Sequence, residues 1–155
     1  MAVRIEVLEE MVMPTILVID DEPLVREVVR DILRDEGYQV VSASHGKDGL
    51  GVLRTVAVDL ILCDLMMPVM AGDVFAATLY ADPRYQHIPL LIMSAAPKAI
   101  PLAPGTYTGV IEKPWTIPHL LHSINTALGA RTYGPTDEPP TSFLVGDANG
   151  PIPAA

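Results

Sequence analysis

Short apolar runs alternate with longer amphipathic stretches along most of the chain. The run from Thr15 to Ile19 is continuous and rich in β-branched residues, which is typical of a strand buried on both faces of a sheet. After an acidic turn, apolar residues recur at helical spacing from Pro23, which suits a first helical turn, until Gly37 ends the element. The same alternation predicts strands at 38–41, 60–63, 90–93 and 109–112, and helices at about 46–55, 73–81 and 118–128.

Strands and helices that alternate in this way favour right-handed crossovers and a parallel sheet covered by helices on both faces. The predicted fold class is therefore α/β, with a doubly wound sheet of five strands. The connection between the fourth and fifth strands is an exception, because it holds Pro97, Pro101 and Pro104. A proline inside a helix costs about 3 kcal/mol, so we expect a shortened or irregular fourth helix there.

The chain of 155 residues, half of them apolar, suits one domain with a core large enough to fold. We assign residues 1–14 to an acidic N-terminal extension and residues 15–128 to the domain. Residues 129–155 are rich in Gly and Pro and poor in large apolar groups. Such a segment cannot bury enough surface to offset the entropy of ordering it, so we expect a flexible tail.

Composition limits the partners and the compartment. A formal net charge of −9, with ten Lys and Arg residues in all, disfavours nucleic-acid binding, which depends on clustered cations. The first residues are too acidic for a secretory signal, and no apolar run approaches the roughly 20 residues that span a bilayer. The single cysteine, Cys63, cannot form an internal disulfide. We expect a cytoplasmic protein with no membrane or nucleic-acid partner.

Chemically active side chains follow four of the predicted strands. Asp20 and Asp21 come directly after the first strand, Asp64 after the third, and then Ser94 and Lys113 after the fourth and fifth. Ligands of open parallel sheets collect at the carboxyl ends of the strands, so these residues can form one site. Converging carboxylates repel one another unless a cation lies between them, and their oxygens suit Mg²⁺. The pattern predicts a divalent-metal site with a lysine at its rim.

Each of these residues also has an ordinary structural explanation. Asp20 and Asp21 can cap the following helix. Asp64 and Ser94 can belong to turns, and Lys113 can be a surface residue before a proline. For any one residue alone we favour that explanation. Because all of them stand at successive strand ends, we favour a functional site for the set.

The segments that carry these residues resemble the signature segments of response-regulator receiver domains, a family of two-component signalling proteins. They are VIDDEP at 18–23, LCDLMMP at 62–68, LIMSA at 91–95 and EKPW at 112–115. One such segment alone is weak evidence, whereas the four in this order are strong evidence. The resemblance covers residues 15–128 and implies a flavodoxin-like sheet with strand order 2-1-3-4-5.

The resemblance also implies a nucleophile and a metal site. Asp64 would be the phosphoacceptor, taking a phosphoryl group from a phosphohistidine on a histidine kinase and forming an acyl phosphate. Mg²⁺ would be bound by the side chains of Asp21 and Asp64 and by the backbone carbonyl of Met66. Asp20 would act on the ion directly or through water.

Two further residues are implied to bind the phosphoryl group. Lys113 would pair with a carboxylate before phosphorylation and with a phosphoryl oxygen after it. Ser94 would hydrogen-bond the phosphoryl group, so that both residues stabilise charge on the transferring group. The protein would then catalyse only its own phosphorylation and dephosphorylation, and would not be an enzyme acting on a separate substrate.

Some positions depart from the family pattern. Val110 stands three residues before the lysine, where family members have Tyr or Phe, and Tyr107 is a nearby candidate to substitute for it. Met66 and Ala96 flank the site at positions where polar side chains could orient an attacking water. Because neither side chain is polar, we expect the phosphoryl group to persist for a long time.

Three functions compete on this evidence. The leading one is a single-domain response regulator that switches a contact with a downstream protein, or relays the group to a histidine phosphotransferase. The alternative is a constitutive, non-cycling receiver-like binding module, against which the intact acids and Lys113 argue. A flavodoxin-like or hydrolytic enzyme would need a glycine-rich phosphate loop or a nucleophile elbow, and the sequence has neither.

Overall fold

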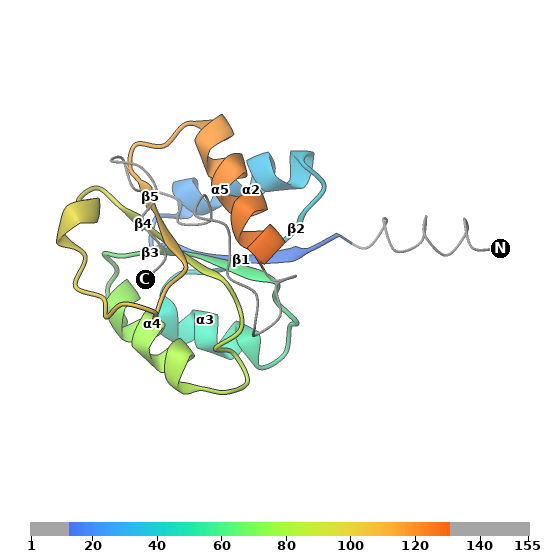
Figure 1. Ribbon diagram of the computed structural model, residues 1–155. Helices are drawn as coiled ribbons and strands as arrows, with labels where there is room; N and C mark the ends of the chain where they lie inside the picture. Colours follow the sequence, from blue (N-terminus) through green and yellow to red (C-terminus); the bar gives the residue numbers. More distant parts are fainter. Residues whose placement is uncertain (1–12, 131–155) are drawn as a thin grey trace.

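A computed structural model describes residues 13–130, which form a parallel sheet between two layers of helices (Figure 1). In chain order the elements are β1 (Thr15–Ile19), α2 (Pro23–Asp35), β2 (Gln39–Ala43), α3 (Gly46–Leu53), β3 (Leu60–Asp64), α4 (Gly72–Ala81), β4 (Leu90–Ser94), the 3₁₀ turn η1 (Pro97–Ala99), β5 (Gly109–Glu112) and α5 (Ile117–Ala130). These bounds differ from the predicted ones by one or two residues, as is usual at fraying ends. Within residues 13–130, every helix is too short or too polar to span a membrane.

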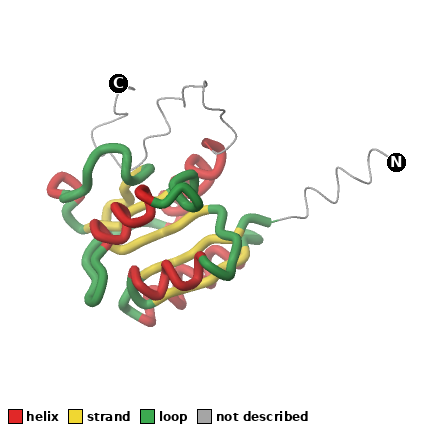
Figure 2. Tube along the Cα trace, turned by 90° about the horizontal axis from the view of Figure 1, so that it is seen from below, coloured by secondary structure: helices red, strands yellow, loops and turns green. Residues whose placement is uncertain are grey.

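The strands follow the order β2-β1-β3-β4-β5 and every neighbouring pair runs parallel, which confirms the predicted fold class. Helices α2 and α5 cover one face of the sheet, and α3 and α4 cover the other (Figure 1). Figure 2 looks onto the face that α3 and α4 cover. The central strand β3 is buried along its whole length. This position explains why its sequence is an unbroken apolar run that ends in Asp64.

Alternate residues of the central strand feed two separate cores, because successive side chains of a strand point to opposite faces. Ile61 and Cys63 pack with Phe75 and the rest of the apolar side of α4. Leu60 and Leu62 pack with the buried residues of α2 and α5. The strand is therefore held from both sides, which fixes the position of its carboxyl end, where the candidate site lies.

Helix α2 begins at Pro23, in a first turn where the missing N–H costs nothing. It ends before Gly37, whose φ of +94° lies in the left-handed region that favours glycine. Val29 and Leu33 form its buried face. Leu24 belongs to the same apolar pattern but is 71% exposed, so the pattern identifies the helix without fixing which apolar residues are buried.

The connection between β4 and β5 holds one short 3₁₀ turn, η1, and is otherwise irregular, as its three prolines predict. Ile100, Leu102 and Tyr107 are partly buried against the core that α3 and α4 cover. Apolar anchors thus hold this segment in place of a helix. The N-terminal extension (1–14) and the tail (129–155) lie almost entirely outside the described residues, so the flexibility of the tail stays a prediction.

Candidate functional site

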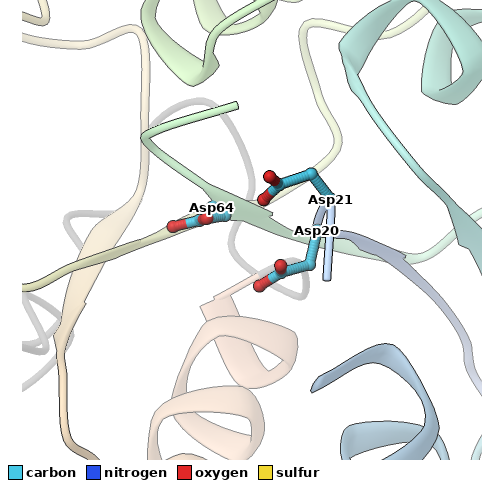
Figure 3. A group of neighbouring side chains, drawn as sticks. All are labelled: Asp20, Asp21 and Asp64. Atoms are coloured by element: carbon cyan, nitrogen blue, oxygen red, sulfur yellow. The ribbon is translucent and has the colours of Figure 1, made fainter. Parts of the chain in front are cut away.

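The acidic residues that follow β1 and end β3 meet at the carboxyl edge of the sheet. The two strands pair directly, with Ile19 beside Cys63, which brings Asp20 level with Asp64. Figure 3 shows the side chains of Asp20 and Asp21 directed from the end of β1 toward the side on which Asp64 lies. One carboxylate oxygen from each of them lies within 4.8 Å of the others. The cluster is therefore small enough for a single cation to bridge.

Asp20 is the most buried member of this cluster, with 1% of its surface exposed. Its Oδ1 accepts the Glu22 backbone N–H at 2.9 Å, whereas its Oδ2 has no hydrogen-bond partner in the described part of the chain. Burial is the main reason that the pKa of Asp20 is raised, and the Asp64 and Asp21 charges raise it further, whereas the Glu22 N–H and the Lys113 ammonium lower it. A buried carboxylate oxygen without a hydrogen bond is costly, so this oxygen stands to gain from a bound cation.

Lys113 supplies the positive charge at the rim of the cluster. It directly follows β5, and its backbone N–H donates to the Ser94 carbonyl at 2.9 Å, which ties it to the end of β4. Its Nζ lies 3.0 Å from Asp64 Oδ1 and 3.9 Å from Asp20 Oδ2. One ammonium thus faces a cluster of three acids, and the remaining negative charge favours a divalent cation.

The capping explanation for the two first acids does not hold for α2. The N-cap of this helix is Glu22, and no side chain caps it. Asp20 instead closes a turn through the Glu22 N–H, and Asp21 is exposed with its carboxylate directed at the cluster (Figure 3). Side-chain capping of α2 therefore does not explain why these two acids precede the helix.

Ser94 and Met66 lie beside the charged cluster. Ser94 ends β4 and is buried, and its Oγ accepts the Ala96 backbone N–H at 3.0 Å. No residue among 13–130 accepts its hydroxyl proton, so the proton can be donated to a ligand. Met66 follows Asp64 by two residues in the loop to α4 and is 78% exposed. The structure thus gathers the acids and the lysine that the sequence points to, with the serine at the next strand end.

Gly72 is a residue of the site that the sequence analysis missed. It begins α4, and its N–H donates to the Leu65 carbonyl at 2.9 Å. A Cβ at this position would lie 2.7 Å from the backbone oxygen of Asp64 and 2.9 Å from the Leu65 Cα. Only glycine allows α4 to approach the end of β3 this closely. The available signal was a glycine opening a helix whose N-cap, Ala71, offers no capping side chain.

Tyr107 cannot take the place of the aromatic residue that the resemblance implies at position 110. Val110 in β5 is buried. Tyr107 precedes β5, and the N–H of the next residue, Thr108, donates to the carbonyl of Leu90 at the start of β4. Ser94 lies at the other end of β4, roughly 13 Å away at about 3.3 Å per residue. Tyr107 therefore lies at the edge of the sheet opposite the site.

Comparisons with known proteins agree with this geometry. A profile of the response regulator receiver domain matches residues 16–125. The chain is similar to the DNA-binding response regulator MtrA of Mycolicibacterium smegmatis, at 30% identity over 142 residues, 90% of this chain and 59% of that protein. It thus spans less than two thirds of the length of the curated relatives it matches first.

Two solved structures share the fold. The chemotaxis response regulator CheY4 of Vibrio cholerae is 27% identical, with a TM-score of 0.66 over 75% of this chain and 99% of that one. The response regulator TrrA of Thermotoga maritima, in complex with Mg(2+)-BeF, is 24% identical, with a TM-score of 0.67 over 74% of this chain and 99% of that one. The second likeness concerns the fold alone.

Proposed function

Since the chain belongs to the family of response regulator receiver domains, signalling proteins of two-component systems, we propose that it is a phosphorylation-dependent switch with Asp64 as its phosphoacceptor. One observation carries this proposal. The Asp64 carboxylate, in a residue 7% exposed at the end of the central strand, has the Lys113 ammonium at 3.0 Å and two further carboxylates beside it. Phosphoryl transfer depends on this kind of positioning and charge stabilisation.

We assign Mg²⁺ to the acid cluster as its cofactor. Asp20, Asp21 and Asp64 offer hard oxygen donors, and the Asp20 Oδ2 that lacks a hydrogen bond would gain most from a cation. The backbone carbonyl of Met66 is a fourth proposed ligand, on the strength of its position two residues after Asp64. TrrA, which has a similar fold, forms a complex with Mg(2+)-BeF, in keeping with this assignment. When bound, the ion would neutralise carboxylate and phosphoryl charge.

In the proposed reaction a carboxylate oxygen of Asp64 attacks the phosphorus of a phosphohistidine. A P–O bond forms, the P–N bond breaks, and its electron pair stays on the departing imidazole, which takes up a proton. Lys113 then pairs with a phosphoryl oxygen, and the Ser94 hydroxyl donates to another. In this proposal the chain catalyses only its own phosphorylation and dephosphorylation.

The proposed phosphoryl donor is a sensor histidine kinase or a histidine phosphotransferase. The proposed target is a protein whose contact with the receiver depends on the phosphoryl group. Return of the group to a histidine phosphotransferase in vitro would identify a relay. A location in the cytoplasm and action away from nucleic acid rest on composition and stay predictions.

Treatment with acetyl phosphate and Mg²⁺, followed by intact-protein mass spectrometry, tests the phosphoacceptor. We expect the wild type to gain the mass of one phosphoryl group, and EDTA to abolish the gain. Asp64→Asn should remove it. Asp35→Asn, at an exposed acid in the last turn of α2, is the matched control and should leave it unchanged. A folded wild type that gains no mass would refute the proposal and favour the constitutive binding module.

A further inference from the structure

Arg26 connects helix α2 to the acidic turn that precedes it. Its side chain is half-buried, and Nη1 donates a hydrogen bond of 2.6 Å to the backbone carbonyl of Asp20, six residues earlier in the chain. Its own backbone N–H donates to the Glu22 carbonyl at 3.1 Å, as expected in the first turn of a helix. The guanidinium therefore reaches back over its helix terminus to the end of β1.

The carbonyl that Arg26 holds belongs to the peptide group joining Asp20 to Asp21. The Asp20 N–H still takes part in the sheet, donating to the Ala43 carbonyl at 3.2 Å. The Asp20 side chain is held by the Glu22 N–H. Among the described residues, Arg26 makes the hydrogen bond that fixes the orientation of the next peptide plane. That plane sets the direction in which the exposed Asp21 side chain leaves the backbone.

In the part of the chain that the structure describes, no carboxylate lies within 4.0 Å of the guanidinium, so none of the described acids is its counterion. It lines an open hollow of about 470 Å³ at the free edge of β2, together with Ser42, Ser44 and Asp48. Water can therefore solvate the part of the guanidinium that the Asp20 carbonyl does not engage. The hydrogen bond to Asp20 is the directional contact that distinguishes Arg26 from a surface cation.

We propose that Arg26 is a positioning residue of the metal site, acting through the Asp20 carbonyl to hold Asp21 and Asp20 in the geometry that binds Mg²⁺. The inference rests on the proposed function only in the identity of the ion. A purely electrostatic role and a positioning role of Arg26 predict opposite changes in Mg²⁺ affinity when the residue is removed. A cation near the site repels Mg²⁺, so removing a purely electrostatic Arg26 would tighten Mg²⁺ binding. Removing a positioning residue weakens it, because the ligands are no longer held in place.

The test measures the Mg²⁺ dissociation constant by calorimetry and by the fluorescence of Trp115, the only tryptophan in the chain. Arg26→Met keeps an apolar stem and removes the donor, and it should raise the dissociation constant on the order of tenfold. Arg26→Lys keeps the charge on a single donor nitrogen, and its Mg²⁺ dissociation constant should lie between those of the wild type and Arg26→Met. Arg34→Met is the matched control, because Arg34 is exposed on the same helix, and it should bind Mg²⁺ like the wild type.

A second readout separates positioning from stability. In acetyl phosphate labelling, Arg26→Met should need more Mg²⁺ for half-maximal rate but reach a near wild-type rate at saturation. Unchanged or tighter Mg²⁺ binding in Arg26→Met would overturn the inference, and so would a lowered melting temperature in EDTA without a change in Mg²⁺ binding. A wild type that binds Mg²⁺ but is never labelled refutes the proposed function alone, since the Mg²⁺ titrations still decide the role of Arg26.

Discussion

Substituting Gly72 by alanine tests whether the close approach of α4 to the end of β3 builds the site. The added Cβ would lie 2.7 Å from the Asp64 backbone oxygen and 2.9 Å from the Leu65 Cα. Both are backbone atoms, so no side chain can swing away to relieve the contact. Either α4 or the end of β3 must move, and this movement displaces the residue that carries the proposed phosphoacceptor.

The expected change in the free energy of unfolding follows from two opposing contributions. Overpacking of a well-packed region costs about 1–3 kcal/mol. Replacing glycine by alanine in a helix gains at most about 1 kcal/mol, and less at the first helical position. We therefore expect Gly72→Ala to lower the free energy of unfolding by about 1–2 kcal/mol. For a domain of this size the melting temperature should fall by roughly 4–8 °C.

Urea unfolding in EDTA measures this loss, and Gly51→Ala is its matched control. Gly51 is exposed within α3 and a Cβ there would meet nothing within 4 Å. That variant should gain roughly 0.5–1 kcal/mol, the ordinary preference of a helix for alanine. The two substitutions are chemically identical and should change the free energy of unfolding in opposite directions. A Gly72→Ala protein at least as stable as the wild type would show that the close approach does not constrain the site.

Three further predictions concern the site itself. Burial raises the pKa of Asp20 above its unfolded value of 3.8, so the native state holds the proton more tightly. The metal-free protein should therefore lose stability as the pH rises from about 3.8 through the higher pKa of the folded state. Asp20→Asn should therefore add about 1 kcal/mol to the free energy of unfolding in EDTA at neutral pH. Urea unfolding should also show a flatter pH dependence, and Mg²⁺ binding should be weaker. A variant less stable than the wild type would contradict this. Lys113→Met should slow acetyl phosphate labelling on the order of a hundredfold, because the phosphoryl charge loses its ammonium, yet retain Mg²⁺ binding; near wild-type labelling would remove Lys113 from the mechanism. The phosphoryl group on Asp64 should be long-lived, and Met66→Asn should shorten its lifetime several-fold by offering a polar group to water, as the decay of the phosphorylated mass peak measures; rapid decay in the wild type would end this idea.

The order of elements and the chemistry at the strand ends can be predicted from the sequence. A strand buried on both faces needs a continuous apolar run, so the limits of the strand can be predicted from its own residues. The first polar residue after the run marks the edge of the sheet. This rule identifies Asp20, Asp64 and Ser94, whereas Lys113 is identified as the residue that directly follows the fifth predicted strand. The prolines of the β4–β5 connection likewise act on their own segment, which is why the missing helix was predictable.

Distances between strand ends depend on register and packing, and these involve residues far apart in the chain. The pairing of β1 with β3 decides that Asp20 faces Asp64, and the 3.0 Å contact of Asp64 with Lys113 joins residues 49 positions apart. The cluster geometry therefore had to come from the tertiary structure. The same holds for the Asp20 oxygen that lacks a hydrogen bond, which becomes costly only once the surrounding elements exclude water.

Two residues show most clearly what the sequence left open. Gly72 resembles any helix-opening glycine until α4 packs against the end of β3. Arg26 resembles any surface arginine until its side chain binds the Asp20 carbonyl in the turn before α2. Local pattern determined which chemical groups stand at the edge of the sheet, because hydrophobic periodicity is a property of short segments. Tertiary packing decided how those groups are held, because close approach and hydrogen-bond geometry exist only between elements that the whole fold has brought together.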